Sequence, residues 1–334
     1  MVKRRVAKNA SLAGIPAGFE EQRVDLGEVT LNYVIGPDAG PPLLLIPGQM
    51  ESWQGYGLVM PALAERFRVV VPDLRGHGKS TRTPGRYSYE ICGADLRAFM
   101  AEVIGAPAVV AGLSSGGVLA LWLGAWAREQ VLAVIAEDPP IFASILPRIR
   151  EERYMRLLFE VAVETLGGPG PRDLRGYFSR LGMPVEGTRE LRMIPPPVVS
   201  VILGLYRMNR ALRPSRPYDV PLLPFNMRAS LKFLSEYDPD FSRATADGSL
   251  GEGFDVEATL RGIACPTLLL RASASRDPYW GILGAIDDED LARVRGLVGD
   301  LRVVEIPGRH EIHMTEGGRY VEEVERFMGE VVGG

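Results

Sequence analysis

The chain has little of what usually marks a secreted, metal-bound or membrane-spanning protein. Cys92 and Cys265 are the only cysteines among 334 residues, too few for a disulfide framework or a cysteine-built metal site. No apolar run approaches the roughly 20 residues that cross a bilayer as a helix. A net charge of −4 gives no general attraction to nucleic acid or to an anionic membrane. We therefore expect a protein of the reducing cytoplasm, with no cofactor, metal, nucleic-acid or membrane partner.

The first 20 residues show no pattern of regular structure. Lys3, Arg4, Arg5 and Lys8 make a basic arm, but no apolar segment follows it as one would in a secretory signal. We expect residues 1–20 to form a solvated tail.

The rest of the chain alternates apolar, strand-like runs with helix-like stretches. A polar–apolar alternation around Gly27 predicts an antiparallel hairpin over residues 21–35. Continuous apolar runs predict buried strands at residues 42–46, 68–71, 107–111, 131–136, 266–270 and 301–306. Helix-like stretches cover residues 52–67, 87–104 and 318–332. This alternation predicts an α/β fold, in which helices cover both faces of a mostly parallel sheet.

The alternation stops after residue 138. From residue 139 to about 260 no strand pattern appears, and helical stretches at 149–166 and 198–212 are interrupted by prolines and glycines. Many Met, Leu, Arg and aromatic residues there suit a helical cap with an apolar underside. We predict a tail (1–20), a core (21–138 and 261–334) and a cap or lid (139–260), whose exposed apolar surface would allow a homo-oligomer.

Residues 112–117, Gly-Leu-Ser-Ser-Gly-Gly, carry the main chemical signal. They join the apolar run at 107–111 to an apolar, helix-like run that begins at residue 118. A serine with glycines two residues before and after it, on a sharp strand-to-helix turn, is the pattern of a nucleophile elbow. The turn leaves no room for side chains beside the serine and projects its hydroxyl outward. Ser114 is therefore the candidate nucleophile.

Four blocks in order make the chain similar to the α/β-hydrolase superfamily. They are L-L-L-I-P-G-Q, V-V-V-P-D-L-R-G-H-G-K-S, G-L-S-S-G-G and V-V-E-I-P-G-R-H, within a resemblance that covers residues 22–138 and 262–332. The resemblance implies an α/β-hydrolase fold with an inserted helical cap, and His310 as the base that serves Ser114. It gives Asp73, Arg75 and His77 a structural role in holding their loop. It leaves His313 as a neighbour of the site or an exposed loop residue.

The carboxylate that would orient His310 is ambiguous. In most of the family it follows the next-to-last strand, but Ser275 stands at that position here, and Asp277 is the first carboxylate beyond it. Glu137 and Asp138 end an earlier strand that opens on the same edge of the sheet. The chain resembles zearalenone lactonases here, because those enzymes keep a glutamate before x-Pro at the earlier strand. That resemblance favours Glu137, with Asp277 and Asp138 as alternatives.

The oxyanion hole is expected to use two backbone N–H groups, as the resemblance implies. One belongs to Ser115, directly after the nucleophile. The other comes from the loop after residue 46, where Pro47-Gly48 replaces the family's His-Gly and makes Gln49 the donor. Gly48 and Trp53 are candidate substrate contacts.

These residues predict a serine hydrolase that cleaves a carboxylic ester or lactone. Ser114 would attack the carbonyl, His310 would move the proton, and Glu137 would hold the imidazolium. The long cap favours a bulky, apolar small molecule, with a macrocyclic lactone such as zearalenone as the sharpest hypothesis. A serine at the elbow argues against the carboxylate nucleophile of haloalkane dehalogenases and epoxide hydrolases. The alternatives are a carbon–carbon bond hydrolase, a ligand receptor on the same fold and an inactive scaffold.

Overall fold

A computed structural model describes residues 6–332, except residues 8 and 169. Its centre is an eight-stranded sheet with the order β1-β2-β4-β3-β5-β6-β9-β12. The hairpin partners β1 and β2 are antiparallel, as are β2 and β4, and all other neighbours in this sheet are parallel. The mostly parallel sheet confirms the predicted fold class.

Each strand predicted for the core is present, with ends that differ by a residue or two. The strands of the main sheet are β1 (Glu20–Asp25), β2 (Thr30–Ile35), β3 (Pro42–Ile46), β4 (Arg68–Pro72), β5 (Ala108–Leu113), β6 (Val131–Glu137), β9 (Thr267–Arg271) and β12 (Leu301–Glu305). Those from β3 to β9 are buried almost throughout, because helices cover both faces of the sheet.

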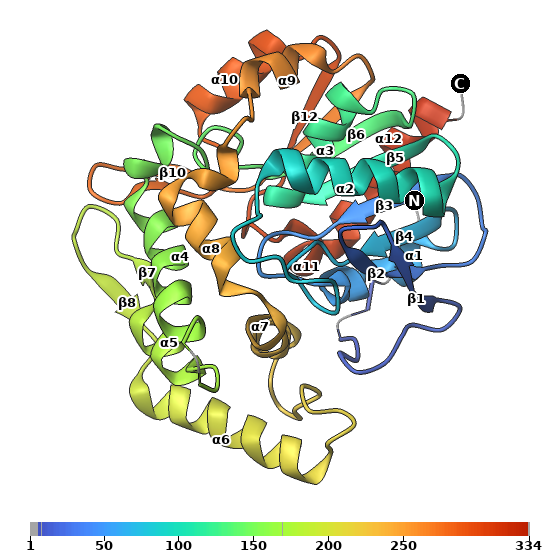
Figure 1. Cartoon of the computed structure of the whole chain (residues 1–334). Helices are drawn as coiled ribbons and strands as arrows, with labels where there is room; N and C mark the ends of the chain where they lie inside the picture. The colour runs from blue at the N-terminus through green and yellow to red at the C-terminus, as the bar shows by residue number, and fades with distance from the viewer. Residues whose placement is uncertain (1–5, 8, 169, 333–334) are drawn as a thin grey trace.

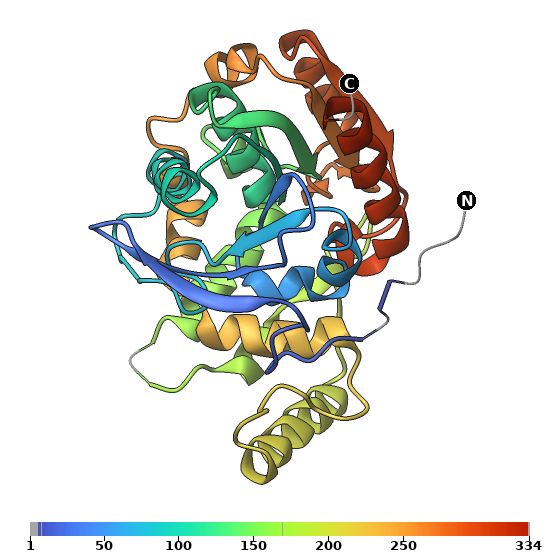
Figure 2. The same ribbon diagram turned by 90° about the vertical axis from the view of Figure 1, so that its right-hand side faces the viewer.

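Two groups of helices form these covers (Figures 1 and 2). One apolar cluster packs α2 (Tyr89–Phe99), α3 (Ser115–Trp126), α9 (Val256–Gly262) and α10 (Asp288–Leu297) onto the sheet. The other packs α1 (Met60–Leu63) and α12 (Gly317–Val332) onto the opposite face. The single helix predicted over residues 52–67 is instead a 3-10 helix, η1 (Trp53–Leu58), followed by α1. No helix in the described ranges has the length and apolar character needed to cross a membrane.

Residues 139–260 lie between β6 and β9, and we call them the inserted segment. Figure 1 shows its helices gathered to one side of the main sheet. They include α4 (Arg153–Leu166), α5 (Leu174–Arg180), α6 (Pro196–Leu212), α7 (Phe225–Glu236) and α8 (Pro239–Asp247). The expectation that this segment has no strands was wrong, since β7 (Gly182–Pro184) and β8 (Leu191–Met193) form a small antiparallel sheet. Strands this short carry too little alternation to be recognised in a sequence.

A small sheet and a short helix follow the last two strands of the main sheet. A two-stranded sheet of β10 (Ser275–Asp277) and β11 (Gly281–Leu283) follows β9, and the short α11 (Ile312–Thr315) follows β12. The remaining turns are η2 (Met100–Ile104), η3 (Arg148–Arg150) and η4 (Ser249–Gly251). Neither β10 nor β11 was predicted.

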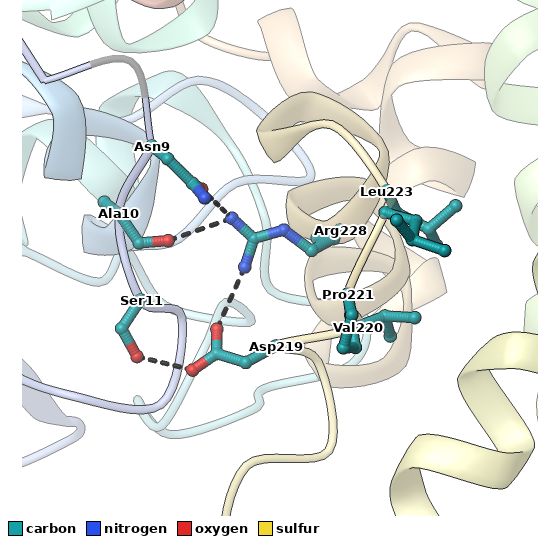
Figure 3. Close-up of a pocket in the computed structure, with 9 residues that line it drawn as sticks. Asn9, Ala10, Ser11, Asp219, Val220, Pro221, Leu223 and Arg228 are labelled. Carbon is teal, nitrogen blue, oxygen red and sulfur yellow. Dashed lines mark hydrogen bonds and ion pairs between the residues drawn. The ribbon is translucent and has the colours of Figure 1, made fainter.

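The expectation of a solvated tail was wrong for the residues just before β1. Leu12 is buried against Phe225 of α7, and its N–H donates to Asp219 at 2.7 Å. Asp219 also accepts from the Ser11 hydroxyl and forms an ion pair with Arg228, as Figure 3 shows. The segment therefore docks on the inserted segment through partners about 200 residues away in the chain, which no local pattern reveals. The basic arm of Lys3, Arg4, Arg5 and Lys8 lies outside the described residues.

Candidate active site

The turn from β5 to α3 has the geometry that the glycine pattern predicts. Ser114 stands at φ 54° and ψ −120°, a conformation that side-chain-bearing residues rarely adopt. A Cβ at Gly112 would lie 2.1 Å from the carbonyl oxygen of Gly116, and one at Gly116 would lie 2.3 Å from that of Ile46. Glycine is therefore required on both sides of the serine, which is partly accessible at the start of α3.

The histidine after β12 pairs with the carboxylate directly after β6. His310 Nδ1 lies 2.6 Å from Asp138 Oδ2, with the Asp138 side chain 1% exposed and the His310 side chain 33% exposed. The Asp138 N–H donates to the carbonyl of Leu270, and its Oδ1 accepts from the Ala272 N–H at 3.2 Å. The carboxylate is thus fixed between β6 and β9, at the end of the sheet beside Ser114. The assignment of Glu137 as the partner of His310 was wrong.

Glu137 has a different partner, for a reason that lies in strand geometry. Side chains alternate along β6, so Glu137 falls on the same face as Ala133 and Ile135. That face is covered by η1 and α12, and there Glu137 binds His313 Nδ1 at 3.0 Å. Asp138 follows the last residue of the strand with φ 43° and is the one that meets His310. The two consecutive carboxylates therefore hold two different histidines.

The two pairs shift their histidines in the same direction. Burial opposes the charge on His310, but the hydrogen bond and negative charge of Asp138 outweigh burial and raise the pKa of His310 to about 9. Burial likewise opposes the charge on His313, but Glu137 raises the pKa of His313 above its usual 6.5. Both imidazoles are thus favoured as cations when their carboxylates are ionised.

The loop after β3, which is predicted to carry an oxyanion donor, passes close to Ser114. Gly48 lies beside the nucleophile, since a Cβ built on it would be 3.4 Å from Ser114 Cβ. In the part of the chain that is described, no protein group accepts a hydrogen bond from the Gln49 N–H. The Gln49 amide side chain instead binds the hydroxyls of Tyr237 and Thr245, at 2.8 and 2.9 Å. The inserted segment thereby holds this loop, and the Gln49 N–H stays available to a ligand.

His77 supports the same loop. It is buried, its Nδ1 lies 2.9 Å from the Arg75 carbonyl, and its Nε2 accepts from the Met50 N–H at 3.2 Å. Burial lowers the pKa of His77 to about 4, so the ring is neutral and can accept that bond. Asp73 accepts from the N–H groups of Trp53 and Lys79. These contacts agree with the structural role expected of the Asp73–His77 loop.

Trp53 and Asp277 are placed away from the roles expected for them. Trp53 is buried in the core cluster on one face of the sheet, and its indole N–H contacts the hairpin, 3.2 Å from a Glu21 carboxylate oxygen. Asp277 accepts from the backbone N–H groups of Gly187, Tyr279 and Trp280. The bond from the Gly187 N–H contributes most, and the three bonds together hold the pKa of Asp277 below its usual range. Asp277 therefore fixes a loop and does not meet His310.

Not every predicted contact is formed. Among the described residues, no hydrogen bond joins the Ser114 hydroxyl to His310, a contact that is often long in unliganded enzymes. No three His, Cys, Asp or Glu side chains in those residues gather as metal ligands. The role of His313 as the partner of Glu137 was missed. The spacing of two histidines by three residues, opposite two consecutive carboxylates, is the signal that could have suggested it.

Comparison with known proteins gives the fold directly. A family model described as the alpha/beta hydrolase fold matches residues 41–168, which hold β3 to α4 with the Ser114 turn and Asp138. The solved enol-lactonase of Burkholderia xenovorans LB400 superimposes with a TM-score of 0.62 at 17% identity, covering 92% of this chain and 99% of that one. The chain has the α/β-hydrolase fold.

Sequence relatives match the chain over short stretches only. A fluoroacetate dehalogenase of a Burkholderia species is 40% identical over 88 residues, 25% of this chain and 29% of that protein. The bifunctional epoxide hydrolase 2 of Sus scrofa is 34% identical over 109 residues, 32% of this chain and 20% of that protein. The chain thus spans less than a third of the length of these curated relatives. Its resemblance to zearalenone lactonases stays a prediction.

Proposed function

We propose that this α/β-hydrolase is a serine hydrolase that cleaves a carboxylic ester or lactone through an acyl-enzyme on Ser114. The observation that carries the proposal is the 2.6 Å pair of His310 and Asp138 at the sheet edge next to the strained Ser114 turn. A nucleophile needs a base within reach, and the base needs a carboxylate that fixes its tautomer and orientation. Because the Nδ1 atom of His310 is bound to Asp138, its Nε2 atom is the one left to accept and donate the proton.

The reaction has two halves. The Ser114 oxygen attacks the carbonyl carbon while His310 Nε2 takes the hydroxyl proton, and the oxyanion accepts from the N–H groups of Gln49 and Ser115. His310 then gives that proton to the leaving alkoxide as the C–O bond breaks, leaving the acyl-enzyme. A water molecule attacks the acyl carbon, His310 takes its proton, and the carboxylic acid leaves as Ser114 regains its hydrogen. With a lactone the alkoxide stays attached to the acyl chain, so the ring opens.

Serine at the elbow favours this chemistry over that of the named dehalogenase and epoxide hydrolase relatives. We favour a bulky, apolar substrate because the inserted segment contacts the loop that carries Gln49. The Tyr237 and Thr245 hydroxyls bind the Gln49 side chain, and the Tyr177 hydroxyl lies 3.7 Å from Met50 Sδ. A macrocyclic lactone such as zearalenone is the most specific candidate, on the resemblance of the Glu-Asp-Pro end of β6.

The test is hydrolysis of p-nitrophenyl esters, simple lactones and zearalenone by the wild type and by Ser114→Ala, together with fluorophosphonate labelling. The proposal expects turnover of at least one ester or lactone, and loss of both turnover and labelling in Ser114→Ala. Labelling that persists in Ser114→Ala would overturn the assignment of the nucleophile. A labelled wild type that turns over no ester or lactone would point to a carbon–carbon bond substrate or to a receptor.

A further inference from the structure

Glu137 and His313 take no step in the proposed reaction, although they are hydrogen-bonded ionisable partners with 0% side-chain exposure. Removing two such groups from water is costly, and apolar residues of similar volume often serve stability equally well. Stability alone therefore does not explain why this pair is present. Its position next to Asp138 and His310 points to another role.

Glu137 holds the chain on the far side of His310. Its Oε1 accepts the backbone N–H of His313 at 2.9 Å and lies 3.0 Å from Nδ1, and its Oε2 lies 3.0 Å from the same nitrogen. His313 stands in the first turn of α11, which begins two residues after His310. The end of β6 is thus hydrogen-bonded to the start of α11 through both the backbone and the side chain of His313.

The Glu137–His313 contact and the Asp138–His310 contact are linked through the backbone. The two carboxylates are neighbours at the end of β6, and the two histidines are three residues apart where the loop after β12 enters α11. The loop is also tied to the residues after β9, where the Gly308 N–H donates to Ser273 Oγ at 3.1 Å. His310 therefore meets Asp138 from a segment that is fixed both before and after it.

The ring of His313 is packed against two buried tyrosines. Its ring stacks on Tyr56 with centroids 4.2 Å apart and planes inclined by 24°, and Tyr320 lies edge-on at 5.9 Å. All three side chains are buried. Within the described residues, neither His313 Nε2 nor the Tyr320 hydroxyl has a hydrogen-bond partner. The contact with Glu137 is thus the only polar contact of the His313 side chain there.

We propose that Glu137 and His313 form a positioning pair that sets His310 against Asp138. The proposal rests on the proposed function, since it assigns His310 the role of the base. Neither residue touches the reacting atoms, so both act through the placement of His310. A shift of about 1 Å in a catalytic group can cost about a hundredfold in rate, and this is the loss expected when the pair is removed.

The test removes the pair without leaving a buried charge. In Glu137→Leu/His313→Leu both ionisable side chains go and only the backbone N–H of residue 313 loses its acceptor, so the fold is expected to survive. His313→Asn keeps an N–H donor near the position of Nδ1 and should restore the contact. Tyr320→Phe is the matched control, because it removes a hydroxyl without a partner from the same cluster. Thermal unfolding checks that each variant is folded.

Two readouts separate positioning from a merely structural role. The first is the downfield proton resonance of the His310 Nδ1–H bond to Asp138, which Asp138→Asn identifies and which needs no substrate. The second is the split between kcat and KM for ester hydrolysis. The double variant should lose the resonance and about a hundredfold in kcat with little change in KM. His313→Asn should stay within about threefold of the wild-type kcat, and Tyr320→Phe should match the wild type.

A folded double variant that keeps the wild-type resonance and kcat would overturn the proposal. Failure of His313→Asn to restore either readout in a folded protein would overturn it as well. Failure of the proposed function looks different, because Ser114→Ala would then leave activity unchanged while the resonance still reports whether His310 is held. If the double variant does not fold, the resonance in His313→Asn and in His313→Leu decides between the two accounts.

Discussion

Two carboxylate–histidine pairs stand side by side at the edge of this sheet, and they differ chiefly in exposure. Asp138 with His310 is open on one side, with 33% of the histidine side chain exposed, whereas Glu137 with His313 is closed to solvent. The chemistry of the two pairs is nearly the same, as are the directions of their pKa shifts. Only the first can meet a substrate and exchange a proton with it. Access, rather than residue type, therefore separates the pair that we propose as catalytic from the pair that we propose positions it.

The largest expected effect comes from breaking the open pair. Asp138→Asn removes the charge that stabilises the imidazolium and favours the wrong tautomer of His310. By analogy with the equivalent change in serine proteases, kcat for ester hydrolysis should fall by about 10⁴. Steady-state kinetics on the best p-nitrophenyl ester measure this. A fall of less than about tenfold would remove Asp138 from the reaction.

The pH dependence gives the next largest effect. His310 can act as a base only when deprotonated, and Asp138 raises its pKa above 6.5 to about 9. Below that pKa, kcat/KM should therefore rise about tenfold per pH unit as the pH increases. The contribution of the two charged histidines to the free energy of unfolding changes with pH in the opposite direction. It is present below pH 6.5 and is lost as the pH rises through the raised pKa of each histidine. A pH–rate profile that levels off below 6.5 would contradict the raised pKa.

Removing the histidine from each pair tests whether the two pairs contribute differently to the free energy of unfolding. His313→Leu leaves Glu137 buried without its partner, which should lower the free energy of unfolding by about 3–5 kcal/mol. His310→Ala should cost less than His313→Leu, because the vacated position of the partly exposed ring lets water reach Asp138. Urea denaturation of both variants measures the difference. Equal losses would mean that the two pairs do not differ as their exposures suggest.

The smallest effect is expected at Asp277. Asp277→Asn keeps an oxygen for some of the backbone N–H groups of Gly187, Tyr279 and Trp280, and it lies outside both pairs. Its kcat should stay within about twofold of the wild type. A loss comparable to that of Asp138→Asn would return the acid to the strand that most α/β-hydrolases use.

The sequence predicted the sheet and the sharp turn at Ser114 because both depend on local patterns. Continuous apolar runs mark the buried strands, and glycines mark a turn at Ser114 where a Cβ would collide with backbone carbonyls. The β7–β8 and β10–β11 pairs were missed because strands of three residues show no period. The docking of Leu12 was missed because it depends on α7, more than 200 residues away.

The choice of acid failed for a different reason. Glu137 and Asp138 are adjacent, and sequence spacing cannot separate them. What separates them is the face on which each side chain falls at the end of β6, together with the left-handed turn at Asp138. Both faces of the strand are buried, so its apolar pattern does not reveal which face leads to the nucleophile. Trp53 was misplaced similarly, since an aromatic residue near the oxyanion loop suits either a pocket or the core.

The most direct test compares the rates at which a fluorophosphonate labels Ser114 in the wild type, Asp138→Asn and Glu137→Gln. This measures activation of the nucleophile without any knowledge of the substrate. The account predicts that Asp138→Asn slows labelling by at least a thousandfold, while Glu137→Gln changes it by about tenfold or less. Labelling that collapses in Glu137→Gln and persists in Asp138→Asn would contradict the assignment of the two pairs.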